Sequence, residues 1–163
     1  MYKENYEKWL EFVSPEDKEI MLNMTEEEKK DAFSETLSFG TAGIRGIMGI
    51  GTNRLNIYNI GMIMKGYSEY LNKMNHSPGV IIGYDTRNNS YKFAVECALV
   101  LNAYGIRTYM FNDIASTPLV SYATHLVSIP NIMGGIMITS SHNEYIYNGL
   151  KIYNFFGAQL SVD

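Results

Sequence analysis

Short apolar runs alternate with helix-like segments through the second half of the chain. The runs are continuous and bounded by glycine, proline or polar residues, which is typical of buried strands. The segments between them begin at serine or threonine, which is typical of helices. The predicted strands are 79–85 ("GVIIGYD"), 106–111 ("IRTYMF") and 133–140, and the predicted helices run from Ser90 to about Tyr104, before Gly105, and from Thr117 toward Pro130. This order predicts strand-helix-strand units with parallel strands.

A fourth apolar run, "GLKIYN" at 149–154, follows after a connection too short for a crossover helix, so it is predicted to run antiparallel. The predicted fold is therefore of the α/β class, a three-layer α/β/α domain with a four-stranded mixed sheet. In open sheets of this kind the ligand lies beyond the carboxyl ends of the strands. Residues 139–143 follow the third strand at that edge, where we expect the functional site.

Residues 1–35 are a polar segment of different character. Ser14 with Pro15 is typical of a helix start, and Thr25 with Glu28 three residues on is a capping-box pattern. Eleven acids and five lysines give this segment a net charge of −6, whereas residues 36–163 carry +2. We therefore divide the chain into a helical N-terminal lead-in at 1–35 and an α/β domain at 36–163. The charges of the lead-in are interpreted as a solvated helix surface.

A glycine-rich segment at 37–54 connects the two parts. It contains five of the fourteen glycines, which predicts a tight loop or hairpin. The stretch from Thr36 to Ser68 has no acid, and its bases are Arg45, Arg54 and Lys65. Three separated bases suit an anionic small molecule better than nucleic acid, which requires a clustered basic stripe.

The composition is that of a soluble globular protein with one core. The chain has 163 residues, of which 46% are hydrophobic and 18% charged. Apolar residues at helical spacing predict a core-facing helix at about 57–73, and Cys97 is interpreted as a small buried hydrophobe. The charged N-terminus and the absence of a run of about 18 apolar residues favour a cytoplasmic protein with no membrane partner.

Two serines and a histidine, Ser140, Ser141 and His142, follow the third predicted strand. An acyl-transfer nucleophile would need a G-x-S-x-G turn and a separate histidine base, but here the histidine adjoins the serine. A phosphoryl carrier needs cations around a dianion, and Arg45, His142 and Lys151 would supply them if the glycine-rich segment folds over the strand ends. The pattern therefore favours phosphoryl transfer.

These residues lie in longer motifs that resemble the first domain of the α-D-phosphohexomutases, the phosphoglucomutase and phosphomannomutase superfamily. The resemblance covers nearly all of the chain from Leu37 onward, and "YEKWL" at 6–10 is similar to the branch with bacterial α-phosphoglucomutases and related phosphopentomutases. The motifs are "FGTAGIRG" at 39–46, "GTNRLNIYNI" at 51–60, "IGYDTRNNSYKFA" at 82–94, "STPLVSYA" at 116–123, "TSSHNEYIYNGLKIY" at 139–153 and "GAQ" at 157–159.

The resemblance implies an isomerase that interconverts sugar 1-phosphate and 6-phosphate through a bisphosphate intermediate. It implies Ser141 as the phosphoserine, Lys151 as the general acid/base, and Arg45 with His142 in the catalytic and phosphate-binding set. It implies Mg²⁺, bound here through the Ser141 phosphate with its other ligands outside this chain, and a glucose 1,6-bisphosphate-type activator. The expected partners are a sugar phosphate and the further domains of the same polypeptide, without which this domain is expected to be inactive.

Two positions depart from the family pattern. Ser140 replaces the usual alanine or glycine, which adds a second hydroxyl, and Glu144 replaces the usual proline. The sequence also leaves alternatives open. They are a non-catalytic phosphosugar- or protein-binding module on the same scaffold, and a phosphopentomutase of the same family.

Overall fold

A computed structural model describes residues 2–40, 43–74, 76–125 and 129–160. The first residue of the expected lead-in, Thr41 and Ala42 of the glycine-rich segment, and the last three residues of the expected 36–163 domain lie outside the described residues.

A mixed sheet forms the centre of the molecule. Its strand order is β1-β5-β4-β2-β3, and β2 runs parallel to both β3 and β4 while β5 runs antiparallel to β4. The strands are β1 (Ile44–Ile47), β2 (Gly79–Tyr84), β3 (Arg107–Met110), β4 (Ile132–Ile138) and β5 (Tyr147–Asn154). The prediction of three parallel strands and one antiparallel strand is confirmed for β2 to β5.

The predicted number of strands was wrong, since the sheet formed by the described residues has five strands and not four. The additional strand, β1, lies inside the glycine-rich segment and pairs antiparallel with β5, so that Arg45 lies opposite Gly149. Four residues among glycines give no strand pattern of their own. Their partner lies about a hundred residues further along the chain, so the pairing is set by tertiary contact.

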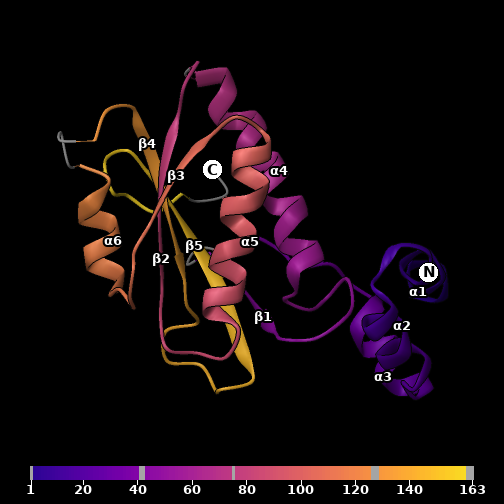
Figure 1. Cartoon of the computed structure of the whole chain (residues 1–163). Helices are drawn as coiled ribbons and strands as arrows, with labels where there is room; N and C mark the ends of the chain where they lie inside the picture. The colour runs from indigo at the N-terminus through magenta and orange to yellow at the C-terminus, as the bar shows by residue number, and fades with distance from the viewer. Residues whose placement is uncertain (1, 41–42, 75, 126–128, 161–163) are drawn as a thin grey trace.

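Helices cover both faces of the sheet (Figure 1). Helices α4 (Ile57–Met74) and α5 (Ser90–Ala103) pack on one face, and α6 (Thr117–Ala123) packs on the other. Ile60, Met64 and Leu71 of α4 are almost completely buried in the larger core, as the sequence predicted. Cys97 of α5 is also buried, and this burial raises the pKa of its thiol. The three-layer α/β/α prediction is confirmed.

The prediction that Ser90 caps the helix now labelled α5 was wrong. The residue before the helix is Asn89, in a left-handed conformation with φ 64°, and Ser90 is already helical. The Ser90 hydroxyl donates a hydrogen bond to Asp85 Oδ1 at 2.7 Å and does not cap the helix.

The lead-in consists of α1 (Tyr2–Phe12), α2 (Pro15–Leu22) and α3 (Glu26–Phe33). The Ser14 side chain caps α2, and Thr25 with Glu28 forms a reciprocal capping box, so both predicted helix starts are confirmed. Trp9, Met21 and Phe33 are the large side chains of a separate small core.

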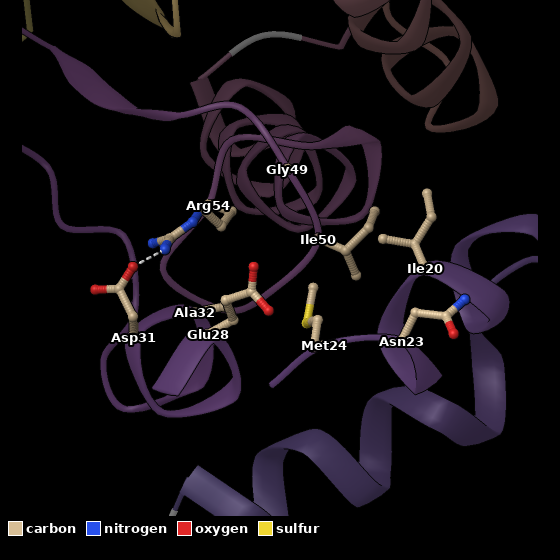
Figure 2. A pocket seen from close by; sticks show the side chains of 9 residues that line it. All are labelled: Ile20, Asn23, Met24, Glu28, Asp31, Ala32, Gly49, Ile50 and Arg54. Atoms are coloured by element: carbon tan, nitrogen blue, oxygen red, sulfur yellow. Dashed lines mark hydrogen bonds and ion pairs between the residues drawn. The ribbon is translucent and has the colours of Figure 1, made fainter. Parts of the chain in front are cut away.

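A pocket of about 500 Å³ lies between the lead-in and the segment 49–54 (Figure 2). The Arg54 guanidinium at this pocket donates to the Asp31 carboxylate, so its charge is already compensated within the chain. The described part of the chain contains no helix that is both long and apolar enough to cross a membrane.

Candidate active site

Two neighbouring serines on the loop that joins β4 to β5 differ in their exposure to solvent. Ser140 is completely buried, and its Oγ has no hydrogen-bond partner among the described residues. Ser141 is exposed. Successive side chains at the end of a strand point in opposite directions, and here only the second hydroxyl reaches solvent. Of the two candidate hydroxyls, Ser141 is therefore the one that a substrate can approach.

The backbone of Ser141 is held in an uncommon conformation. Its φ of 55° lies in the left-handed region, which few residues other than glycine adopt. The Ser141 N–H donates to Thr139 Oγ1 at 2.9 Å, and the Asn143 N–H donates to the Ser140 carbonyl at 3.1 Å. These bonds form a tight turn directly after β4.

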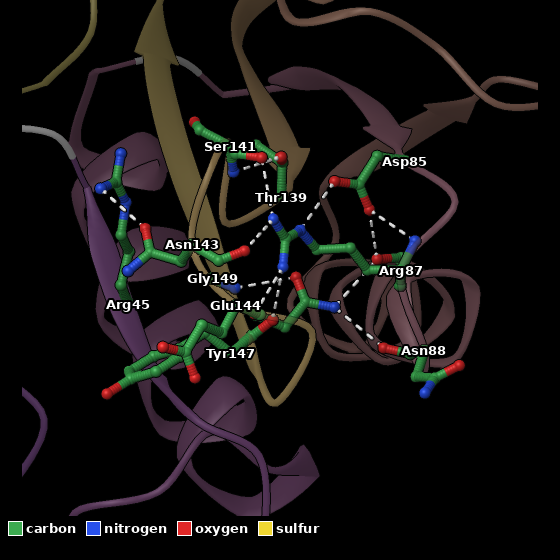
Figure 3. A network of polar contacts seen from close by, with 12 residues as sticks. Arg45, Asp85, Arg87, Asn88, Thr139, Ser141, Asn143, Glu144, Tyr147 and Gly149 are labelled. Atoms are coloured by element: carbon green, nitrogen blue, oxygen red, sulfur yellow. Dashed lines mark hydrogen bonds and ion pairs between the residues drawn. The ribbon is translucent and has the colours of Figure 1, made fainter.

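Arg87 lies at the centre of this loop (Figure 3). Its guanidinium donates to the backbone carbonyls of Ser141 and Asn143, both at 2.8 Å, and to those of Glu144 at 2.9 Å and Tyr147 at 3.1 Å. Sequence reasoning did not assign a role to Arg87. The available signal was its position just after β2, since the carboxyl ends of neighbouring parallel strands meet at one edge of the sheet.

Arg45 reaches the same loop from the edge strand β1. Its Nη1 donates to Asn143 Oδ1 at 3.2 Å, two residues beyond Ser141. Its Nε is buried without a hydrogen-bond partner, and it forms no ion pair with a carboxylate of the described residues. A guanidinium with unused donors and no neutralising carboxylate is suited to bind an anion.

Lys151 lies on β5, on the same side of the sheet as Arg45. Arg45 pairs with Gly149, and Lys151 is two residues further along the same strand, so both side chains leave the same face. Lys151 is half-buried, and His142 is exposed on the loop itself. Arg45 and Lys151 therefore lie on one face of the sheet, and His142 lies on the loop that leads into β5. Among the described residues, no hydrogen bond joins them to one another or to the Ser141 hydroxyl.

A pocket of about 400 Å³ lies beside the loop, between Asp85 and Tyr145. The Asp85 carboxylate already accepts hydrogen bonds from the Ser90 hydroxyl and the Arg87 N–H. Within the described ranges, no three His, Cys, Asp or Glu side chains are grouped to hold a metal ion. Mg²⁺ commonly binds through carboxylates together with phosphate oxygens.

The profile of the family "Phosphoglucomutase/phosphomannomutase, alpha/beta/alpha domain I" matches residues 36–163. The chain belongs to this family. It is similar to the phosphoglucomutase of Staphylococcus epidermidis, with 41% identity over 146 residues, and to that of Staphylococcus aureus, with 43% identity over 136 residues. These matches cover 90% and 83% of this chain, but 26% and 24% of the two relatives. The chain thus spans about a quarter of their length.

Solved structures show the same fold. A Thermus thermophilus protein assigned as a phosphomannomutase matches with a TM-score of 0.70 and 26% identity, over 78% of this chain and 28% of that one. A Paramecium phosphoglucomutase, parafusin, matches with a TM-score of 0.65 and 21% identity, over 79% of this chain and 24% of that one, which supports the fold alone. The resemblance of the sequence motifs to the first domain of the phosphohexomutases is confirmed.

Proposed function

We propose that this chain is the phosphoserine-bearing first domain of a phosphohexomutase, and that Ser141 carries the phosphoryl group. The observation that carries the proposal is the loop after β4. It exposes Ser141 and buries Ser140, and it lies within hydrogen-bond reach of Arg45, a guanidinium without a carboxylate partner. Membership of the phosphoglucomutase/phosphomannomutase family supports the same reading.

In the first half-reaction, a hydroxyl of a sugar monophosphate attacks the phosphorus of phosphoserine 141. The new O–P bond forms on the sugar as the Ser141 O–P bond breaks, and the products are a sugar bisphosphate and a Ser141 oxygen that takes up a proton from solvent. Lys151 accepts the proton from the sugar hydroxyl. Arg45 and His142 face the transferring phosphate and stabilise its negative charge.

The second half-reaction reverses these steps on the other phosphate. After the bisphosphate turns over, the Ser141 hydroxyl loses its proton to solvent as its oxygen attacks the phosphorus that came with the substrate. The sugar O–P bond breaks, and Lys151 returns its proton to the sugar oxygen that is released. The phosphoserine is regenerated and the product is the isomeric sugar phosphate. A glucose 1,6-bisphosphate-type activator would restore an enzyme that has lost its phosphate.

Several parts of this reaction are assigned to further domains of the same polypeptide. Mg²⁺ would have one ligand in this chain, a phosphate oxygen on Ser141, and its carboxylate ligands are expected elsewhere. When bound, the metal supplies charge neutralisation at the phosphoryl group. Sugar recognition and the clamp on the non-reacting phosphate are likewise expected outside this domain.

The test compares the two serines in the polypeptide that joins this chain to those domains. Ser141→Ala should abolish the covalent phosphate and lower turnover by about a thousand-fold or more, because the carrier atom is lost. Ser140→Ala is the matched control and should retain both, since its hydroxyl is buried. Intact mass and peptide mapping locate the phosphate. A phosphate mapped to Ser140, or turnover retained by Ser141→Ala, would overturn the assignment.

A further inference from the structure

We infer that Arg87 is a positioning residue, which fixes the conformation of the loop 141–147 so that Ser141 is presented beside Arg45. The inference rests on the proposed function in taking Ser141 as the phosphate carrier. The network of contacts itself is independent of that role. Arg87 lies on the loop between β2 and α5, so its bonds to the loop join segments more than fifty residues apart.

Four N–H donors of the Arg87 side chain form hydrogen bonds with the loop, and the fifth faces a carboxylate. Nη2 donates to the carbonyls of Ser141 and Asn143, and Nη1 donates to those of Glu144 and Tyr147. Nε lies 3.5 Å from Asp85 Oδ2. A guanidinium carries five donors, and those of Arg87 are directed at the loop carbonyls and at Asp85 rather than toward a substrate phosphate. Arg87 therefore acts through the loop, in contrast to Arg45, whose Nε is unpartnered.

Asp85 and its hydrogen-bond partners hold the Arg87 guanidinium in place on the side away from the loop. The Asp85 carboxylate accepts bonds from the Arg87 backbone N–H at 3.0 Å and from the Ser90 hydroxyl at 2.7 Å. Asn148 Nδ2 donates to the Ser90 hydroxyl at 2.9 Å and to the Asn88 carbonyl at 3.0 Å. The Arg87 side chain is only 14% exposed. A network with this many bonds orients the Arg87 guanidinium toward the loop and shields it from water.

The loop needs this support because it has little regular structure of its own. Ser141 is in the left-handed region, which costs conformational free energy and persists only where surrounding contacts impose it. Arg87 binds the Ser141 carbonyl while Thr139 binds the Ser141 N–H, so both peptide groups that flank the residue are fixed. Without Arg87, four carbonyls would lose their charged donor at once.

The first experiment measures amide hydrogen exchange in this 163-residue chain. Arg87→Lys keeps the charge but replaces a planar fork with three donors on one nitrogen, which cannot serve carbonyls along the whole loop. We expect amides in 140–147 to exchange about ten-fold faster or more, with β2 and α5 unchanged. Arg107→Lys is the matched control, because exposed Arg107 lies at the opposite edge of the sheet and should change nothing. Unchanged loop exchange in Arg87→Lys would overturn the inference, as would faster exchange throughout the sheet.

The second readout tests the link to Ser141. Phosphoserine is encoded at position 141, and its ³¹P chemical shift is compared with that of a free 139–147 phosphopeptide. The wild-type shift should differ from the peptide value, and Arg87→Lys should move it toward that value. Arg45→Gln should also move it, but with loop exchange unchanged. A wild-type shift that differs from the peptide value but is insensitive to Arg87→Lys would overturn the positioning role. A wild-type shift equal to that of the peptide, with loop exchange still dependent on Arg87, would instead count against the proposed function and support the loop network.

Discussion

At Gly149, any side chain would collide with the backbone of the neighbouring strand. A Cβ built there would lie 2.3 Å from the Ile44 carbonyl oxygen of β1, 3.0 Å from the Thr139 carbonyl oxygen and 3.1 Å from Arg45 Cγ. The position thus combines close strand pairing with room for the Arg45 side chain, which crosses the space that a larger residue would fill.

Gly149→Ala should lower the free energy of unfolding by about 1–3 kcal/mol, because backbone atoms cannot move aside without disturbing the sheet. Denaturant unfolding of the chain measures this. Gly66→Ala is the control, since Gly66 lies in α4 with nothing within 4 Å of a built Cβ, and alanine there should stabilise the helix by about 0.5–1 kcal/mol. Equal stability of Gly149→Ala and wild type would contradict the predicted clash.

The individual residues of the site were only partly predictable from sequence. Ser141 and Arg45 could be selected because a hydroxyl after a buried strand and a lone base among glycines are local patterns. Arg87 could not, because its four acceptors lie 54 to 60 residues away and are backbone carbonyls. Backbone acceptors cannot be recognised from residue type. The position of Arg87 after β2 could therefore place it at the site, but could not show what it binds.

At the scale of elements, Tyr58 connects the lead-in to α4. Its hydroxyl accepts from the Ser14 N–H at 2.8 Å and donates to Asp17 Oδ2 at 2.6 Å, at the start of α2. Its ring packs edge-on against Trp9 of α1 with ring centroids 5.5 Å apart. The division into lead-in and α/β domain stays a prediction, but these contacts show how the two parts are joined.

Tyr58→Phe should destabilise the attachment of the lead-in by about 1–2 kcal/mol while keeping the aromatic packing. Hydrogen exchange should accelerate in α1 to α3 and stay unchanged in β2 and β4. Burial and the bond donated to Asp17 raise the pKa of the Tyr58 phenol, so the hydroxyl's contribution is complete below about pH 10 and is lost as the pH rises through the raised pKa. The difference in lead-in hydrogen exchange between Tyr58→Phe and wild type should therefore become smaller at alkaline pH.

Tyr70→Phe is the control for this prediction. Tyr70 is also on α4, but it is 46% exposed and its hydroxyl has no hydrogen bond with the described residues. Tyr70→Phe removes the same oxygen atom but should leave hydrogen exchange in α1 to α3 unchanged. If both variants behaved alike, the bonds to Ser14 and Asp17 would not be what attaches α2.

Elements with strong local signals were predicted well, and the element without one was not. The helix starts at Ser14 and Thr25 have side-chain caps within three residues, which a sequence pattern can show directly. The strand β1 has no such signal, because its four residues acquire strand geometry through pairing with β5. Missing β1 also changed the expected position of a candidate site residue. Arg45 belongs to the edge of the sheet itself, and not to a loop folded over it.

At the scale of the whole molecule, the sheet brings the parts of the candidate site to one end. In Figure 1 the connection from β4 to β5 and the connection from β2 to α5 lie together at the lower end of the sheet. Helices α4 and α5 cover one face and α6 the other, and their buried residues form two separate core clusters against the sheet. A hydrophobic core therefore covers both faces of the sheet, and the candidate site lies at one end of it.

We accordingly expect the 163-residue chain to unfold cooperatively and yet to show no measurable mutase activity by itself. Folding depends on the buried sheet and its helices, which the chain contains. Turnover depends on neutralising the phosphoryl charge and clamping the second phosphate, and the residues proposed for these tasks lie outside the chain. The loss of one such electrostatic element can lower a rate on the order of a hundred-fold or more, and the proposal assigns several of them to further domains.

A coupled dehydrogenase assay of glucose 6-phosphate formation checks this, with Mg²⁺ and glucose 1,6-bisphosphate present and Ser141→Ala as the blank. A cooperative denaturant transition on the same preparation shows that any inactivity does not come from misfolding. Turnover above the blank would mean that Arg45, His142 and Lys151 suffice for charge neutralisation, and the assignment of the remaining chemistry to further domains would then be wrong. A non-cooperative transition would instead show that the two core clusters do not stabilise the fold without contacts from outside this chain.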